Sequence, residues 1–423
     1  MGLLDPLTAV VVSFCLLGLM LYKRVNLGIT LNATAILLAL LALDWWSIPS
    51  IAYTTVDPSQ SDGLLAISVI LATFGIMWLS QLYKETGEIT KLSESLSKLV
   101  KNPKIVLSVL PAIIGFLPVA GGALMSAPIV DSEAEKLKLK PEKKTYVNLW
   151  FRHTIFPVYP LSQVLIMTAA LTGTTLFAII LLQIPTVIVM VVAGYWIGFW
   201  KVSTFRNGEK TKATDKASSE IKNFLLAFSP ILATIIVAVS INLLGYRFSQ
   251  QGFDVLIATF VGLAVLIVIS RLNVKMLATP LKGFGIYGVT LAVYGAFLLR
   301  NVMKAAGISE IFKPLVMNGS MDIIVLLTVI PAVLGFLTGS PSGAIAIGVS
   351  ILTGIITSFS PKTAALLYIS AYLGYVIAPT HLCFTFTADY FKTPLGKVYK
   401  YVIPSFIATF ATALLVYFMP FSF

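Results

Sequence analysis

Three side chains that can carry charge fall within stretches that are otherwise typical of membrane spans. Arg152 and His153 lie inside an apolar stretch over 147–171, and His381 comes two residues after Pro379, which interrupts a second apolar stretch. A charged or titratable group at membrane depth costs free energy, so such groups usually face the protein interior or a watery path and serve a function. Histidine also changes charge near neutral pH when unperturbed. We therefore centre a candidate site on Arg152, His153 and His381, which could carry charge or take up and release protons.

Each of these residues also has a plainer interpretation. Arg152 lies near the predicted cytoplasmic end of its span, where a long side chain can reach the surface. His381 serves equally well as a structural histidine that is hydrogen-bonded beside the helix break. Asp131, Asp322 and Asp389 occupy the ends of apolar stretches, and no Asp or Glu falls in the middle of a span. A cation exchanger built on buried carboxylates is therefore disfavoured, and an anion site is favoured.

Hydroxyl groups and glycines gather at four interruptions of the apolar stretches. A helix that begins at an interruption presents free N–H groups and the positive end of its dipole, which favour anions. Glycine lets a ligand approach the backbone, although small residues also serve tight helix packing in membranes. For Ser162, Gln163 and Thr380 a capping role is the alternative. The predicted substrate-binding residues are Gly121, Gly122, Ser162, Gly339, Ser340, Ser342, Gly343, Thr380 and His381.

Two of the interruptions belong to a sequence that occurs twice. Pro-Ala-Ile-Ile-Gly-Phe-Leu at 111–117 returns as Pro-Ala-Val-Leu-Gly-Phe-Leu at 331–337, with five identities in seven. Each copy runs into a cluster of Gly, Pro or Ser and then resumes as an apolar stretch. This pattern predicts a re-entrant hairpin, because irregular backbone survives at membrane depth only inside protein or beside water. We predict hairpins at 105–130 and 323–357, with two kinked membrane-spanning helices as the alternative.

The composition places the chain in a membrane. It is 57% hydrophobic and 11% charged, with a mean hydropathy of +0.92, whereas soluble domains carry about 25% charged residues. The net charge of +12 fits the cytoplasmic loops of a membrane protein, so we expect a lipid bilayer and no nucleic acid as partner. Cys15 and Cys383 both lie in apolar stretches. We therefore expect neither a disulfide framework nor a thiolate metal site, and no cofactor.

About ten membrane spans of roughly 20 residues are predicted. Their bounds are Leu7–Tyr22, Leu27–Leu43, Gly63–Tyr83, Val147–Leu171, Thr174–Trp200, Phe224–Leu244, Phe253–Ser270, Phe284–Val302, Ala364–Phe386 and Val402–Met419. If both hairpins return to the side they entered, the cytoplasmic loops hold 24 Lys and Arg and the outer segments hold five. This asymmetry satisfies the positive-inside rule and places both termini outside a cell (plasma) membrane.

The repeat extends beyond the hairpins and gives each half five crossings. Tyr-Pro at 159–160 matches Ala-Pro at 378–379, which marks a proline-broken span in each half. An odd number of crossings orients the halves oppositely, as in the inverted repeats of many secondary transporters. The predicted fold is thus an all-α polytopic membrane protein with two inverted repeats. The first repeat is 1–200, with a hairpin at 105–130 and a broken helix at 147–171. A cytoplasmic linker follows at 201–223. The second repeat is 224–423, with a hairpin at 323–357 and a broken helix at 364–386.

The predicted function is secondary active transport of a small anionic solute by alternating access, coupled to H⁺ or Na⁺. Walker A, HExxH and GxSxG sequences are absent from the chain, so we expect neither ATP-driven transport nor an enzyme. His381 is the predicted proton carrier, and sodium held by backbone carbonyls at the hairpin tips is the rival. A passive anion channel in the same fold and a transporter of a neutral or cationic solute are the alternatives.

Three stretches resemble a known group of membrane proteins. They are the hairpin at 115–122, Phe-Arg-His at 151–153 followed by Tyr-Pro at 159–160, and Ala-Pro-Thr-His-Leu at 378–382. Over nearly its whole length the chain resembles the integral-membrane domain-of-unknown-function family 401, which is grouped in the ion transporter superfamily with citrate, gluconate, divalent-anion and arsenite transporters. The resemblance implies an elevator-type architecture, a homodimer, and transport of organic carboxylates or oxyanions with Na⁺ or H⁺. The tips depart from the Ser-Asn-Thr of the sodium–dicarboxylate branch, because they are Ala-Gly-Gly at 120–122 and Gly-Ser-Pro-Ser at 339–342.

Overall fold

The fold is helical throughout the part of the chain that the structure describes. The computed structural model describes residues 2–117, 122–202, 215–245, 252–308, 310, 322–353, 355–356 and 358–420. Within these ranges every regular element is a helix and no strand occurs. The prediction of an all-α fold is therefore confirmed.

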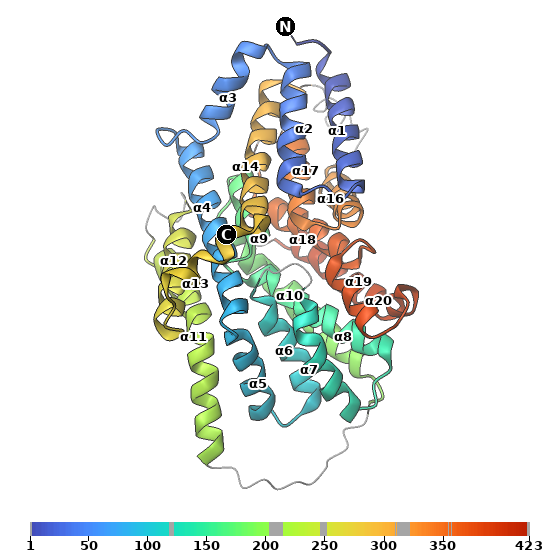
Figure 1. The fold of residues 1–423 in the computed structure, drawn as a ribbon. Coiled ribbons are helices and arrows are strands. Elements are labelled where there is room, and N and C mark those ends of the chain that lie inside the picture. Colours follow the sequence, from blue (N-terminus) through green and yellow to red (C-terminus); the bar gives the residue numbers. More distant parts are fainter. Residues whose placement is uncertain are drawn as a thin grey trace.

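The helices follow one another closely along the chain. In the first half α1 spans Pro6–Tyr22, α2 Leu27–Ala42, α3 Ile48–Thr54, α4 Ser61–Glu85, α5 Glu88–Leu99, α6 Pro103–Gly115, α7 Ala123–Lys136, α8 Pro141–Thr154, α9 Gln163–Thr172 and α10 Leu176–Phe199. In the second half α11 spans Asp215–Leu243, α12 Phe253–Ile269, α13 Val274–Ala278, α14 Phe284–Ala305, α16 Ile323–Thr338, α17 Pro341–Leu352, α18 Pro361–Ile377, α19 Leu382–Tyr390 and α20 Leu395–Phe418. Short 3₁₀ turns are η1 at Trp45–Ser47, η2 at Phe156–Val158 and η4 at Pro280–Lys282. In Figure 1, α1–α3 lie at the upper end of the molecule and α5–α7 at the lower end.

Seven helices among the described residues are long and apolar enough to cross a membrane. They are Ser61–Glu85, Pro141–Thr172, Leu176–Phe199, Ser218–Leu243, Phe284–Ala305, Pro361–Tyr390 and Leu395–Phe418. Two of the seven contain the predicted interruptions, which separate α8 from α9 and α18 from α19. Three more predicted spans correspond to the shorter apolar helices α1, α2 and α12, which have 17, 16 and 17 residues. These helices are compatible with a multi-pass membrane protein.

Helix boundaries recur at the spacing of the sequence repeat. After α4 and after α14, Gly87 and Gly307 adopt positive φ angles of 73° and 66°. These two glycines are as far apart along the chain as the two copies of the repeat, and so are Pro141 and Pro361, which begin α8 and α18. Proline suits the first position of a helix because the N–H that it lacks would have no partner there. The two halves of the chain therefore use the same local signals to begin and end corresponding helices.

The repeated sequence lies in two pairs of mutually packed helices, α6 with α7 and α16 with α17. Both first helices begin at a side-chain cap. The Asn102 Oδ1 atom accepts from the backbone N–H of Lys104 at 3.0 Å, and Asp322 Oδ1 accepts from that of Ile324 at 2.8 Å. The second pair is broken at 339–340, while most of the break in the first pair lies outside the described residues. Compared with the predicted hairpins, α7 extends beyond residue 130, to Lys136, and α17 ends before residue 357.

One glycine in each pair lies directly against the following interrupted helix. A Cβ atom on Gly115 would lie 2.4 Å from the carbonyl oxygen of Arg152, and one on Gly335 would lie 2.2 Å from that of Ala371. Neither position accepts a larger residue unless the backbone shifts. Gly115 and Gly335 occupy the same position in the two copies of the repeat. Close backbone contact therefore holds α6 to α8 and α16 to α18 in the same way.

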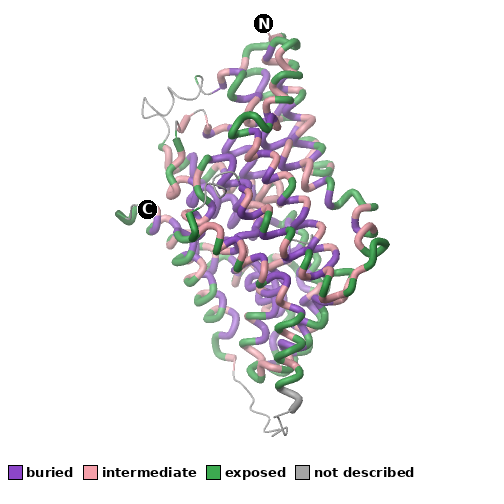
Figure 2. Tube along the Cα trace, turned by 90° about the vertical axis from the view of Figure 1, so that its left-hand side faces the viewer, coloured by how far each residue is buried: buried purple, intermediate pink, exposed green. Residues whose placement is uncertain are grey.

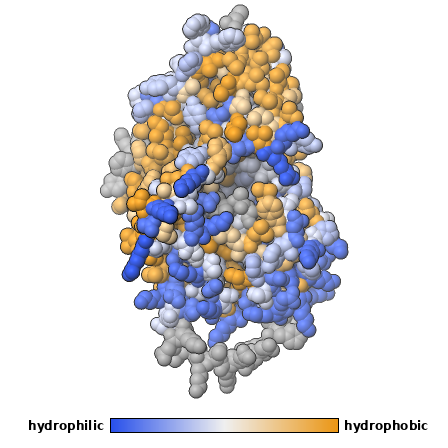
Figure 3. All heavy atoms as spheres, in the orientation of Figure 1, coloured by the Kyte–Doolittle hydropathy of each residue, from blue (hydrophilic) through white to orange (hydrophobic). Residues whose placement is uncertain are grey.

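Buried residues run along the middle of the molecule, and exposed residues lie toward its outside and its ends (Figure 2). Large hydrophobic side chains on α10 and α20, such as Ile188, Trp196 and Ile407, are more than half exposed. Extensive exposed apolar surface is expected where a protein contacts lipid. In Figure 3 hydrophilic residues gather at the lower end of the molecule and hydrophobic residues cover much of its upper part.

The segment predicted as a linker, 201–223, is partly helical. Residues 203–214 lie outside the described residues, and α11 begins at Asp215, so the span predicted to begin at Phe224 starts earlier. On this polar start of α11, Glu220 forms an ion pair with Lys98 of α5 at 3.1 Å. An exposed pair of this kind contributes little to stability. It does show that the start of α11 lies beside α5, where the sequence predicted a linker.

Candidate functional site

A cavity of about 430 Å³ lies where the two interrupted helices meet the second helix pair. Figure 1 shows α9, α17 and α18 converging near the middle of the molecule. The cavity is lined by Asn26, Leu27, Arg152, His153, Phe156, Gln163, Val164, Met167, Gly288, Val289, Ala292, Val293, Gly339, Ser340, Pro341, Ser342, Tyr375, His381, Leu382 and Cys383. None of these residues is Asp or Glu. An apolar wall with a few convergent polar groups is the usual composition of a small-molecule site.

Four helices begin at the wall of this cavity. The starting residues that lie on the wall are Asn26 and Leu27 for α2, Gln163 for α9, Ser340 and Pro341 for α17, and His381 and Leu382 for α19. The first N–H groups of a helix lack partners within the helix and carry the positive end of its dipole. The cavity therefore collects the positive ends of four helices, which favours an anionic ligand.

Arg152 of α8 adds a full positive charge to the same wall. The residue is 1% exposed, so its side chain does not reach the surface as the alternative interpretation required. Its Nη2 donates to the carbonyl oxygen of Leu117 at 3.1 Å. Nε and Nη1 are buried without a partner among the described residues, and no ion pair found there includes Arg152. A buried guanidinium without a counter-charge is costly, and a bound anion would remove that cost.

His153, His381 and Cys383 meet at another part of the wall. All three residues are buried, and one ligand atom from each lies within 4.8 Å of the others. The two imidazole rings are 4.7 Å apart, edge to face. The sequence predicts no thiolate metal site, yet the fold brings Cys383 beside a histidine from the other half of the chain. Two nitrogens and one sulfur at this spacing form a donor set that transition metals accept.

The break between α16 and α17, residues 339–340, is called the second tip below. Gly339 adopts a φ of 59°, and a Cβ on it would lie 2.6 Å from Thr380 Oγ1 and 3.0 Å from the Thr380 carbonyl oxygen. Ser340 caps α17, because its Oγ accepts from the N–H of Gly343 at 3.3 Å. Thr380 itself is exposed and donates to the carbonyl oxygen of Phe336 at 3.4 Å. The second tip thus rests on the interruption before α19 while it faces the cavity.

The break between α6 and α7, residues 116–122, is called the first tip. Gly122 is buried and lies off the cavity wall, and Gly121 lies outside the described residues. Asn148 of α8 holds the start of α7 through its Nδ2, which donates to the Ala123 carbonyl oxygen at 2.8 Å. Its Oδ1 accepts from Ser126 Oγ at 2.5 Å. Buried hydrogen bonds therefore occupy Asn148, Ser126 and the Ala123 carbonyl beside the first tip.

At the interruption before α9, Gln163 lies on the cavity wall in place of the predicted Ser162. Ser162 is buried, lies off the wall and makes no side-chain capping bond to α9. Gln163 lies on the wall, and its Nε2 is buried without a partner among the described residues. The donor at this break is therefore an amide.

The structure brings part of the predicted site together. Arg152, His153, Gly339, Ser340, Ser342 and His381 line the cavity, whereas Gly122, Ser162, Gly343 and Thr380 do not. The sequence interpretation missed Asn26, Tyr375 and Cys383. Cys383 follows His381 by two residues, so its place at a helix start was a usable signal. No local signal linked Asn26 to this site, because its helix is distant in sequence.

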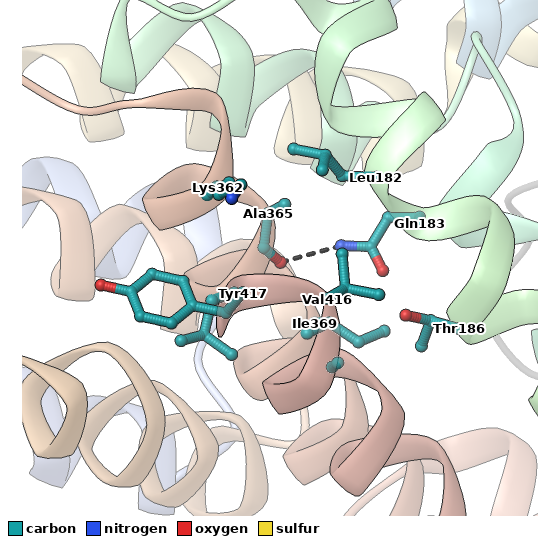
Figure 4. A pocket seen from close by; sticks show the side chains of 10 residues that line it. Leu182, Gln183, Thr186, Lys362, Ala365, Ile369, Val416 and Tyr417 are labelled. Atoms are coloured by element: carbon teal, nitrogen blue, oxygen red, sulfur yellow. Dashed lines mark hydrogen bonds between the residues drawn. The ribbon is translucent and has the colours of Figure 1, made fainter. Parts of the chain in front are cut away.

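A much smaller cavity lies between α10, α18 and α20 (Figure 4). Its volume is about 10 Å³, which is roughly the space for one water molecule. Gln183 reaches across it, and its Nε2 donates to the carbonyl oxygen of Ala365 at 2.8 Å. This bond ties α10 to α18 within apolar surroundings, and the space is too small for a solute.

A protein-family model described as a protein of unknown function (DUF401) matches residues 6–419. The chain belongs to this family. No curated protein matches it. The region that matches the DUF401 model includes both tips, both interrupted helices and every residue of the cavity wall.

Proposed function

We propose that this DUF401 protein is a secondary active transporter of a small anionic solute, which binds in the cavity beside the second tip. The solute is an organic carboxylate or an oxyanion, and it moves by alternating access coupled to an H⁺ or Na⁺ gradient. The observation that carries the proposal is the buried guanidinium of Arg152, which reaches the cavity wall without a counter-charge.

The hydrogen-bonding groups on the wall match an anion better than a cation. Buried donor atoms without a partner among the described residues are Arg152 Nε and Nη1 and Gln163 Nε2. Guanidinium groups bind carboxylates and phosphate-like oxyanions with paired N–H donors. The four helix starts add positive potential, and the described residues of the wall include no carboxylate to attract a cation. A neutral or cationic solute would leave the charge of Arg152 uncompensated.

The architecture that we propose is a pair of inverted repeats, in which α6–α7 and α16–α17 are re-entrant hairpins. Helix bounds that match at the spacing of the sequence repeat support it, as do the equivalent close contacts of Gly115 and Gly335. With hairpins that cross nothing, each half has five crossings, so the halves have opposite orientation. Transporters of this kind bind their solutes between the repeats, beside broken helices. The cavity here is bounded by an interrupted helix from each half.

The grouping of the helices supports an elevator mechanism. One group contains α1, α2, α4, α11, α12 and α14, and the other contains both helix pairs, both interrupted helices, α10 and α20; within each group neighbouring helices pack together. In Figure 1, α11 and α12 lie to the left, whereas α8, α19 and α20 lie to the right. The cavity has wall residues from both groups, since α2 and α14 face α9, α17 and α19 across it. We propose that the second group carries the solute past the first.

Binding is tested by thermal unfolding of the purified protein with a panel of carboxylates and oxyanions. A ligand at 100 times its Kd stabilises the folded state by about 2.7 kcal/mol, so a matching anion raises the melting temperature. Arg152→Gln should abolish that rise. Arg300→Gln is the matched control, because Arg300 is also a largely buried arginine with an unpartnered Nε but lies off the cavity wall. A rise that persists in Arg152→Gln, or no rise with any anion, contradicts the proposal.

Transport is tested by counterflow in proteoliposomes that contain the protein and an anion found in the binding assay. A carrier shows uptake of labelled anion stimulated by unlabelled anion inside, whereas a passive anion channel shows none. Imposed Na⁺ and pH gradients, applied one at a time, then identify the coupling ion. Uptake that ignores both gradients and lacks trans-stimulation replaces the transporter with a channel.

A further inference from the structure

The cavity wall holds one group of side chains that anion binding does not explain. We propose that His153, His381 and Cys383 form a three-ligand site for Zn²⁺ whose fourth coordination position faces the cavity. All three residues are buried, lie on the cavity wall and place one ligand atom each within 4.8 Å of the others. The proposal concerns metal binding and stands apart from transport.

Both histidines are already oriented as metal-binding histidines are. The Nδ1 atom of His153 lies 2.7 Å from the carbonyl oxygen of Leu149, and that of His381 lies 3.3 Å from the carbonyl oxygen of Val376. A carbonyl oxygen can only accept, so each Nδ1 carries the hydrogen and each neutral ring keeps its lone pair on Nε2. Nε2 of His381 has no partner among the described residues. Metal-ligating histidines commonly donate their other N–H to a backbone carbonyl in this way.

Aromatic rings hold both imidazoles in place. The His381 ring centroid lies 3.9 Å from that of Tyr375, and the His153 ring lies 5.7 Å from Phe156 and 5.8 Å from Tyr375. An apolar shell of this kind limits access of water to a bound metal and fixes the ligand geometry. The cavity gives the ion its entry path.

The donor set selects the metal. Ca²⁺ and Mg²⁺ require oxygen ligands, whereas thiolate and imidazole suit Zn²⁺, which binds nitrogen at about 2.0–2.1 Å and sulfur at about 2.3 Å. Tetrahedral geometry places such ligand atoms about 3.3–3.7 Å apart. Ligand atoms that are at most 4.8 Å apart need only small rotations of the side chains to reach that spacing. With three protein ligands, one position stays open toward the cavity, as in zinc sites that bind a small molecule.

Charge on the wall is compatible with a bound ion. Cys383 binds Zn²⁺ as a thiolate and releases its proton to water, so the thiolate offsets one of the two positive charges. Arg152 lies on the same wall, and its positive charge stabilises the thiolate. The positive charge that remains is one more reason for an anion to occupy the open position.

The experiment is a titration of the purified, metal-free protein with Zn²⁺ against a coloured chelator, followed by Co²⁺ in place of Zn²⁺. We expect one Zn²⁺ per chain and, with Co²⁺, the absorption band of a thiolate bound to cobalt. Cys383→Ser should remove that band and weaken Zn²⁺ binding by at least about 100-fold. Loss of a residue that only hydrogen-bonds to a metal ligand already costs up to about 100-fold, and loss of the ligand itself should cost at least as much. His153→Gln should weaken Zn²⁺ binding by a similar factor and keep the thiolate band.

Cys15 supplies the matched control, because it is the other cysteine of the chain and is exposed on α1. Cys15→Ser should bind Zn²⁺ and Co²⁺ as the wild type does. The proposal is overturned if the wild type binds no stoichiometric Zn²⁺, if Co²⁺ gives no thiolate band, or if Cys15→Ser abolishes the band. The wild-type spectrum decides the matter even where a variant fails to fold. Since these readouts need no anion, failure of the metal site and failure of the transport proposal are separately visible.

Discussion

The two tips follow helices that share a sequence and a packing contact, but the residues around the tips differ. Each follows a capped helix, and each of those helices packs a glycine against an interrupted helix so closely that an added Cβ would lie 2.4 Å or 2.2 Å from a carbonyl oxygen. Beside the first tip the polar groups are engaged in buried bonds to Asn148, and Gly122 lies off the cavity. The second tip puts Gly339 and Ser340 on the cavity wall.

In the function that we propose, the first tip supports the site and the second tip binds the solute. Arg152 links the two regions. Its Nη2 donates to the Leu117 carbonyl oxygen at the first tip, while the same side chain lies on the cavity wall with Nε and Nη1 that have no partner among the described residues. In this arrangement the first tip fixes the position of the charge, and the second tip forms part of the wall where we propose that a solute binds. A repeated motif can therefore be kept for its packing in one copy and for its exposed groups in the other.

The largest expected effect concerns the side of the membrane from which each helix pair, α6–α7 and α16–α17, enters. In a Cys15→Ser background, single cysteines at Asn102 and Asp322 test the two matched helix caps, both of which are exposed. An impermeant thiol reagent applied to intact cells should label only Asp322→Cys, because the proposed topology places position 102 inside and 322 outside. Cys383 is buried and should stay unlabelled. Equal labelling of the two positions would remove the inverted orientation.

The largest loss of stability is expected at the first tip. Asn148→Ala removes the buried bonds from Asn148 to Ser126 and to the Ala123 carbonyl, and leaves those two groups with only each other, at 3.1 Å. Each lost bond costs about 0.5–1.5 kcal/mol, and the space left by the amide adds to that loss. We expect a large fall in melting temperature, measured in detergent, with the anion-induced rise still present in the folded fraction. If the variant instead keeps its stability and loses anion binding, the first tip belongs to the binding site.

Gly115→Ala and Gly335→Ala should destabilise the protein to a similar extent. Each adds a Cβ that meets a carbonyl oxygen of the neighbouring helix, and overpacking of this kind costs about 1–3 kcal/mol. Chemical unfolding of both variants beside the wild type measures the effect. Similar losses of stability would show that the two helix pairs pack equivalently and differ only at their tips. A loss confined to one glycine would show that their packing is not equivalent.

The smallest effect on stability is expected at the second tip. Ser340→Ala removes the cap of α17, which is worth about 1 kcal/mol, and it should weaken anion binding several-fold because the group lies on the wall. Ser360→Ala is the matched control. Ser360 caps α18 with an equivalent bond to the Thr363 N–H at 3.2 Å, yet it lies outside the cavity. Equal effects of both variants on anion affinity would assign Ser340 a purely structural role.

Much of the fold could be predicted because its signals are local. Proline, glycine and capping residues mark both tips and both interruptions, so a single pass along the sequence locates them. The start of α11 was misplaced because Ser and Thr near it indicated a loop, while its helix continues beside α5 and pairs Glu220 with Lys98. That contact joins residues that are distant in sequence, and local patterns do not report it.

The site itself could be predicted only in part, for the same reason. His381 and Ser340 were found because they lie at breaks. The different roles of the two tips depend on Asn148, whose amide reaches a helix that begins 25 residues earlier. The meeting of Cys383 with His153 joins the two halves of the chain. Such contacts depend on how whole helices pack together, and local sequence patterns do not predict that packing.

The short helices α1 and α2 bear on the lipid around the protein. At 17 and 16 residues they are about 24–26 Å long, whereas the hydrocarbon core of a bilayer is about 30 Å thick. A bilayer that thins beside such short helices lets them cross, at a cost of a fraction of a kcal/mol per Å of mismatch. The protein should therefore be more stable in bilayers of shorter acyl chains and should partition away from thick, sterol-rich regions. Under the elevator mechanism that we propose, a bilayer that is thinned in this way also shortens the distance over which the solute must be carried.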